Sequence, residues 1–122
     1  MESEVIEKGS PDQPRDEKGR WASGAATARA ASADKAAAHH TNMSATHEAA
    51  QTRELSRNQL HAAAAKAHNA AAFHYRSAAH FDRGGHHLLA QLANGRAQRY
   101  ANDAHTRSDA LGGQFAGRRP PK

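Results

Sequence analysis

The chain contains no cysteine, and its only β-branched aliphatic residues are Val5 and Ile6. Without cysteine it can form neither a disulfide framework nor a thiolate metal site. Sheet folds need strands rich in β-branched and aromatic side chains, and aromatic residues make up only 5% of this sequence, so sandwiches, barrels and parallel sheets are excluded. No apolar run approaches the length of a membrane span, and the acidic, polar start MESEVIEKGS does not resemble a signal peptide, so no membrane association is expected.

Alanine occupies 30 of the 122 positions. It is the best helix former but has little side chain to bury, so it predicts closely packed helices around a thin core. We therefore predict an all-α fold, either an alanine-rich antiparallel helical hairpin or a three-helix bundle with disordered termini, completed by a homo-oligomer or a protein partner. Between residues 24 and 111 there are eleven large apolar or aromatic side chains: Met43, Leu55, Leu60, Phe73, Tyr75, Phe81, Leu88, Leu89, Leu92, Tyr100 and Leu111.

Composition divides the chain into three parts. Residues 1–22 are predicted to be a disordered acidic tail, because proline, glycine and dense charge leave little apolar surface to bury. Residues 23–111 are predicted to be the helical domain and residues 112–122 a basic flexible tail. The helices are expected at about 24–40, from 44 or 56 to 83, and at 86–110.

The start of the second helix has two predictions. Ser56 as N-cap would place Gln59 in a capping box, and Leu55 and Leu60 would form a hydrophobic staple around it. No glycine or proline interrupts residues 44–81, however, so one uninterrupted helix over that range is the alternative.

The helices are expected to pack through small residues. In heptads counted from Leu60, mostly alanine lies at the d and e positions, which predicts close backbone approach. Gly84 and Gly85 predict a turn, and the phase of the last helix persists across Asn94 and Gly95. The second helix has Leu60, Ala67, His74 and Phe81 at the a positions. The expected apolar stripe of the last helix is Leu89, Ala93, Ala97, Tyr100, Ala104 and Leu111, widened by Leu88 and Leu92.

The net charge of +5 is unevenly distributed. Residues 1–20 are mildly acidic and the rest of the chain is basic, which suggests an anionic partner, with nucleic acid the first candidate. With no zinc-finger or stacking-sheet motif, such binding would be to the phosphate backbone and sensitive to salt. The alternative is that these side chains only solvate exposed helix faces. The candidate nucleic-acid contacts are Arg76, Arg83, Arg96, Arg99, Arg107, Arg118, Arg119 and Lys122.

Ten histidines raise the question of a metal site. Two ligands on one helix converge at a spacing of three or four, and no two histidines are so spaced. His105 and Asp109 are the one matching pair, so they are weak candidates; no metal or other cofactor is predicted, and a site between helices is left open. His61 and His68 begin a row continued by Tyr75 and Asp82, interpreted as a polar or half-exposed packing stripe. Catalytic motifs are absent, so the protein is expected to be non-enzymatic.

The eleven residues from Gln13 to Ser23, QPRDEKGRWAS, resemble a short element of tailed-bacteriophage and prophage proteins, including head-associated ones. Such elements commonly have threonine after the tryptophan, where this chain has Ala22. The rest of the chain loosely resembles small helical bacterial and phage proteins. The resemblance implies a phage-encoded origin. Within this segment Trp21, with Arg20 and Arg15, is the expected partner-binding anchor.

These observations give three hypotheses of function. The first is a phage virion or assembly component, or a small binder of phage or host machinery, located in the host cytoplasm or the virion. The second is a sequence-independent nucleic-acid-binding protein, with DNA as a candidate ligand. The third is a histidine-mediated metal binder.

Overall fold

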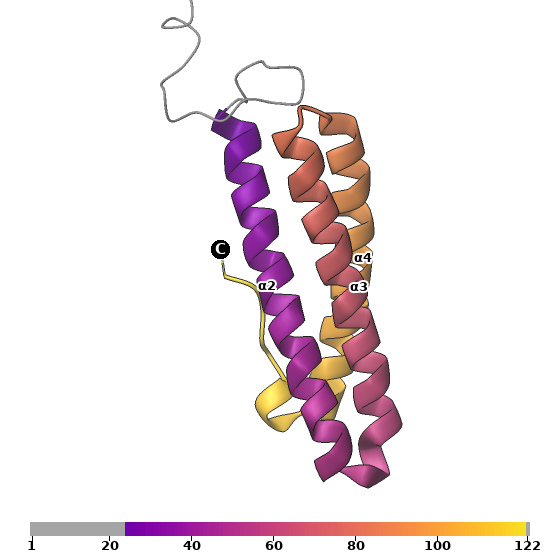
Figure 1. Ribbon diagram of the computed structural model, residues 1–122. Coiled ribbons are helices and arrows are strands. Elements are labelled where there is room, and N and C mark those ends of the chain that lie inside the picture. The colour runs from indigo at the N-terminus through magenta and orange to yellow at the C-terminus, as the bar shows by residue number, and fades with distance from the viewer. Residues whose placement is uncertain (1–23, 122) are drawn as a thin grey trace, which may run out of the picture.

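A computed structural model of the chain describes residues 24–121. Three long helices account for most of this part: α2 (Gly24–Arg53), α3 (Asn58–Arg83) and α4 (His87–Leu111). Two 3₁₀ turns, η1 (Leu55–Arg57) and η2 (Gly113–Phe115), follow α2 and α4. The helices run antiparallel in sequence order, with α3 packed against both of the others (Figure 1). The all-α prediction is confirmed, in its three-helix form.

The first helix is longer than expected. It continues past His40 to Arg53, because Met43, Ser44 and His47 lie on its buried face and packing outweighs their weaker helix propensity. The helix ends where Glu54 leaves the helical region, with φ −121° and ψ 72°. The predicted end near residue 40 and the uninterrupted helix over residues 44–81 are therefore both wrong.

The boundary predicted at Ser56 lies within two residues of the start of α3, but its mechanism differs. Arg57 is the N-cap residue and makes no side-chain capping hydrogen bond. Leu55 is 76% exposed and Leu60 is 56% exposed, so the expected hydrophobic staple does not form. Instead the short 3₁₀ turn reverses the chain direction.

The expected small-residue core is present, but most of the leucines predicted to flank it are exposed. On α4 the predicted stripe residues Ala93, Ala97 and Ala104 are buried, whereas Leu88 is 77% exposed and Leu92 is 59% exposed. Alanine seams bring the helix axes close together and leave no space for leucine at their centre. The predicted core positions that prove exposed are Leu60, Leu88, Leu89, Leu92 and Tyr100.

The α3–α4 turn is at the glycine pair predicted to form it. Gly85 has a φ of 82°, which favours glycine, and the His86 amide donates to the Phe81 carbonyl at 2.8 Å. Just before the turn the buried Asp82 accepts hydrogen bonds from Arg29 of α2 and from His87 of α4. Although burial opposes ionisation of Asp82, these bonds outweigh it and lower its pKa. One carboxylate thus ties the three helices together at this end.

The C-terminal segment is part of the packed structure, contrary to the predicted flexible tail. After a left-handed Gly112 with φ 72°, Phe115 turns back into the bundle and is 3% exposed. Asp109 accepts a hydrogen bond from the Gly117 amide at 2.8 Å and forms an ion pair with Arg119 at 2.9 Å. The segment then runs back along α2 (Figure 1).

None of the helices within residues 24–121 combines the length and the apolarity that a membrane span requires.

Candidate metal centre

Histidines occupy the space that large apolar residues would normally fill. His40 and His47 of α2 and His61 and His68 of α3 are all 0% exposed. The two residues of each pair are seven apart, so they share the alanine face that each helix turns inward. The row from His61 to Asp82 is therefore a packing feature, as expected, in which His61, His68 and Asp82 are buried and only Tyr75 is half-exposed.

The imidazole rings separate α2 from α4. His105 of α4 stacks on His40 with ring centroids 5.0 Å apart, and Tyr75 stacks on His40 at 5.7 Å. At the other end of the cluster Phe115 stacks on His47 at 4.5 Å. Aromatic rings in these arrangements pack favourably and exclude water.

A hydrogen-bond chain begins at the surface beside the α2–α3 turn. Glu54 Oε1 lies 3.0 Å from His61 Nε2. His61 Nδ1 lies 3.0 Å from His47 Nδ1, and His47 Nε2 lies 2.8 Å from the hydroxyl of Ser108 on α4. These contacts satisfy both nitrogens of two fully buried rings.

The same hydroxyl continues the chain inward. Ser108 Oγ lies 2.9 Å from His68 Nε2, and His68 Nδ1 lies 2.7 Å from His40 Nδ1. We refer to the complete set as the imidazole chain: Glu54, His61, His47, Ser108, His68 and His40.

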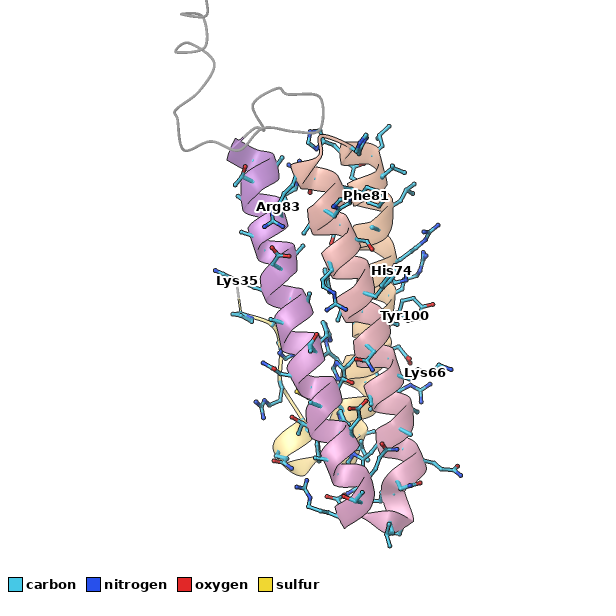
Figure 2. The ribbon with its side chains drawn as sticks, viewed as in Figure 1. Lys35, Lys66, His74, Phe81, Arg83 and Tyr100 are labelled. Carbon is cyan, nitrogen blue, oxygen red and sulfur yellow. The ribbon has the colours of Figure 1, made fainter. Side chains whose placement is uncertain are left out.

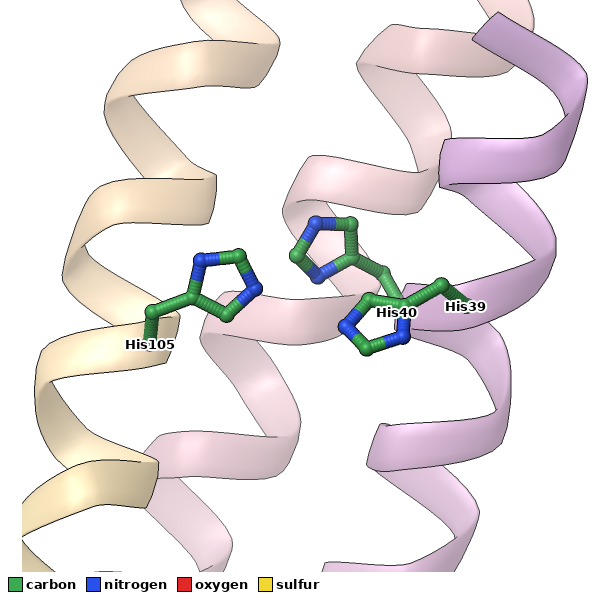
Figure 3. Close-up of side chains that lie close together, drawn as sticks. All are labelled: His39, His40 and His105. Atoms are coloured by element: carbon green, nitrogen blue, oxygen red, sulfur yellow. The ribbon is translucent and has the colours of Figure 1, made fainter. Parts of the chain in front are cut away.

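At the inner end of the imidazole chain three histidines converge. His39, His40 and His105 each offer one ring nitrogen, and these three atoms all lie within 4.8 Å of one another. Two of the side chains come from α2 and one from α4, and they face one another across the gap between the helices (Figure 3). We refer to these residues as the trihistidine centre.

The trihistidine centre also contains unpaired polar atoms. Nε2 of His39, of His40 and of His105 are each buried and have no hydrogen-bond partner. Leaving a buried nitrogen unpaired typically costs about 1–3 kcal/mol, and most buried side-chain polar atoms in native proteins are paired.

Burial lowers the pKa of the interior imidazoles because it removes the water that would solvate their charged forms. The pKa falls to about 3 for His40 and His68 and to about 4 for His47 and His105. Burial also lowers the pKa of His39, and the neighbouring C-terminal arginines add to this. The centre is therefore neutral at pH 7, the form in which imidazole binds metals.

The separation of the nitrogens suits a small tetrahedral ion. Zinc binds histidine nitrogen at about 2.0–2.1 Å, which puts two such ligands about 3.4 Å apart. Since the nitrogens already lie within 4.8 Å of one another, small side-chain rotations are enough to close the site. His39 is only half-buried, and it gives the centre a path to the surface.

Only one member of the predicted His105–Asp109 pair belongs to the centre. Asp109 is instead engaged by Arg119 and by the Gly117 amide. The hydrogen bond from Arg119, followed by that from Gly117, lowers the pKa of Asp109 to about 2. The Asp109 carboxylate therefore binds the C-terminal segment and does not contribute to the trihistidine centre.

The predicted nucleic-acid contacts are spread over different parts of the surface. Arg83 pairs with Asp34 of α2 at 2.6 Å, and Arg107 pairs with Asp103 of its own helix at 3.0 Å. Arg76 donates to Thr41 of α2, and Arg118 to the Gln114 carbonyl. Arg96 and Arg99 instead line a surface hollow with His74, Tyr100 and Asp103, on the side of the bundle away from α2 (Figure 2).

Four predicted contacts cannot be placed. Arg15, Arg20, Trp21 and Lys122 lie outside the described residues.

Searches of protein-family models, curated proteins and solved structures found no significant match to the chain.

The spacing rule missed His39 and His40 because it applies to ligands on one helix. They are adjacent in sequence, and their partner His105 comes from another helix. The signal that could have located the cluster is the repeat of a seven-residue histidine spacing in two segments, at residues 40 and 47 and at residues 61 and 68. That repeat would have indicated two facing histidine rows.

Proposed function

We propose that this chain binds a divalent transition-metal ion of the zinc type in the trihistidine centre. The observation that supports it best is the convergence of one ring nitrogen from each of three histidines within 4.8 Å, in a cluster whose three Nε2 atoms are buried without a hydrogen-bond partner. A metal ion would give this cluster the polar partner that it lacks. It would also add a second link between α2 and α4, beside the hydrogen bond between His47 and Ser108.

The donor set favours zinc and its neighbours over magnesium or calcium. Neutral imidazole suits zinc, copper and nickel, whereas the lighter cations prefer carboxylate and carbonyl oxygen. Three histidines would leave a fourth position of tetrahedral zinc to water. No reaction is assigned to that position.

Zinc titration of the full chain tests the proposal. We expect binding of one equivalent, and at a free zinc concentration of 100 times Kd the fold should gain about 2.7 kcal/mol. For a domain of this size that gain corresponds to a rise in Tm of roughly 10–20 °C. Calorimetric titration and thermal unfolding measure the two quantities.

His39→Ala and His105→Ala should each weaken zinc binding by at least about tenfold. His80→Ala, at an exposed position on α3, is the matched control and should bind like the wild type. Equal losses in all three variants, or no binding by the wild-type chain, would contradict the proposal.

We propose as a second function that the outer face of α3 and α4 binds a second copy of the chain. The observation that favours it is the exposure of Leu92 (59%) and Phe73 (59%), apolar side chains that a monomer gains nothing by exposing. Each of the two helices is about 37 Å long, so together they present enough surface for the roughly 800 Å² that each partner buries in a standard interface. The large apolar residues exposed on α3 and α4 are Leu60, Phe73, Leu88, Leu89, Leu92 and Tyr100.

Light scattering on purified protein tests self-association. We expect a homo-oligomer for the wild type and a monomer for the double variant Leu88→Glu, Leu92→Glu. Because both leucines are exposed, these substitutions should leave helicity unchanged. A monomeric wild-type chain would contradict this second proposal.

An assembly role in a phage particle, suggested by the resemblance at residues 13–23, would use the same oligomer. If nucleic acid instead co-purifies and is released by salt, the arginine-based alternative is favoured.

A further inference from the structure

The two ends of the imidazole chain are chemically different, and this difference sets which group donates and which accepts in each of its hydrogen bonds. An ionised carboxylate can only accept hydrogen bonds. The hydrogen bond with His61 contributes most to lowering the pKa of Glu54, so this carboxyl is ionised at neutral pH. In the contact between them, His61 Nε2 must therefore be the donor.

A neutral imidazole carries one proton, so each assignment fixes the next. With its proton on Nε2, His61 has a lone pair on Nδ1 and accepts from His47 Nδ1. His47 then has a lone pair on Nε2 and accepts from the Ser108 hydroxyl.

The second half of the chain follows the same rule. Having donated its only proton, Ser108 accepts from His68 Nε2. His68 Nδ1 is then a lone pair and accepts from His40 Nδ1. His40 is left with an unprotonated Nε2, which is one of the unpaired nitrogens of the trihistidine centre.

We propose that Glu54 is a positioning residue for the metal centre, acting through the imidazole chain to hold His40 in the tautomer whose Nε2 can bind a metal. Residues 40 and 54 are separated by roughly 20 Å along the helix axis. The metal-binding part of this inference rests on the proposed function. The tautomer part does not.

The tautomers can be measured on the metal-free, full-length protein by long-range ¹H–¹⁵N correlation NMR at neutral pH. We expect the proton on Nδ1 in His40 and His47. We expect it on Nε2 in His61 and His68. A His40 that carries its proton on Nε2 would overturn the proposal, as would an imidazolium at His61, which would donate from both nitrogens and reverse every later bond.

Reversing the hydrogen bond at the surface end should reverse the direction of every hydrogen bond in the imidazole chain. Glu54→Lys replaces an acceptor with a donor, so His40 should move its proton to Nε2. Glu48→Lys makes the same charge change at an exposed position of α2 and should leave all four tautomers unchanged. Glu54→Gln keeps the side-chain shape and can donate or accept, so His40 should show both tautomers even if the lysine variant does not fold.

Zinc affinity gives the second readout. With His40 in the wrong tautomer, Glu54→Lys should bind zinc about 10- to 100-fold more weakly than Glu48→Lys. Unchanged tautomers in both Glu54 variants would overturn the proposal. If the wild type binds no zinc but shows the expected tautomers, the proposed function fails while the directional chain stands.

Discussion

Lowering the pH from about 7.5 to 5 is expected to unfold the helical bundle. The pKa is about 3 for His40 and His68 and about 4 for His47 and His105 in the folded chain, because burial disfavours the charged rings. In the unfolded chain each pKa returns to about 6.5. The unfolded state therefore binds protons in the window between these values, and the folded state does not.

This difference in proton binding makes the folded state less stable as the pH falls. Stability is fully present above pH 6.5 and falls as the pH is lowered toward 3–4, where the folded state would also take up protons. Each histidine removes roughly 1.4 kcal/mol per pH unit, so four of them remove roughly 8 kcal/mol by pH 5. A loss of that size is comparable to the whole stability of a small domain, typically about 5–15 kcal/mol.

Denaturant unfolding at several pH values, followed by helical circular dichroism, measures this effect. The dependence of unfolding free energy on pH should approach an uptake of four protons below pH 6. His80→Ala, which alters an exposed ring, should show the same acid transition as the wild type. A free energy of unfolding that stays constant between pH 7.5 and 5 would show that the interior rings are not held neutral.

Truncation of Phe115 should cost about 3–5 kcal/mol of unfolding free energy, the usual range for a buried phenylalanine. Its ring is 3% exposed and packs on His47 at 4.5 Å and on His61 at 4.9 Å. Phe115→Ala would therefore leave a cavity and also admit water to two buried imidazoles.

Leu55→Ala is the matched control for this prediction. The Leu55 side chain is 76% exposed and lies outside the proposed self-association face, so its truncation should change stability by less than about 1 kcal/mol. Chemical denaturation of both variants at neutral pH makes the comparison. Similar losses in the two would mean that the C-terminal segment does not complete the core.

Sequence reasoning predicted the helices better than it predicted the interior. Alanine content and the pair Gly84–Gly85 were enough for the fold class and the α3–α4 turn, because helix propensity and positive φ are local properties. The burial of His61 in preference to Leu60 depends on partners from distant segments, including Ser108. No hydropathy pattern contains that information, because it depends on which hydrogen-bond partners the other helices supply.

The trihistidine centre was missed for a related reason. His39 and His40 lie side by side in sequence, and the third histidine, His105, comes 65 residues after His40 on another helix. Phe115 was missed because it follows Gly112 and Gly113, which correctly predicted the end of α4 but also suggested a free tail. Whether a segment packs after a helix ends depends on the surface that it meets. Here Phe115 meets the rings of His47 and His61.

Alanines and histidines share one heptad position along α2, and this affects the register of α2 against α3. Ala26 and Ala33 precede His40 and His47 at the same heptad phase, so the alanine seam alone would look much the same after a slip of seven residues. Such a slip would bring Ala33 to the level of His68 and leave that ring without its partner. Buried polar groups can select one alignment among several in this way. The interior histidines thus specify which turn of α2 faces which turn of α3.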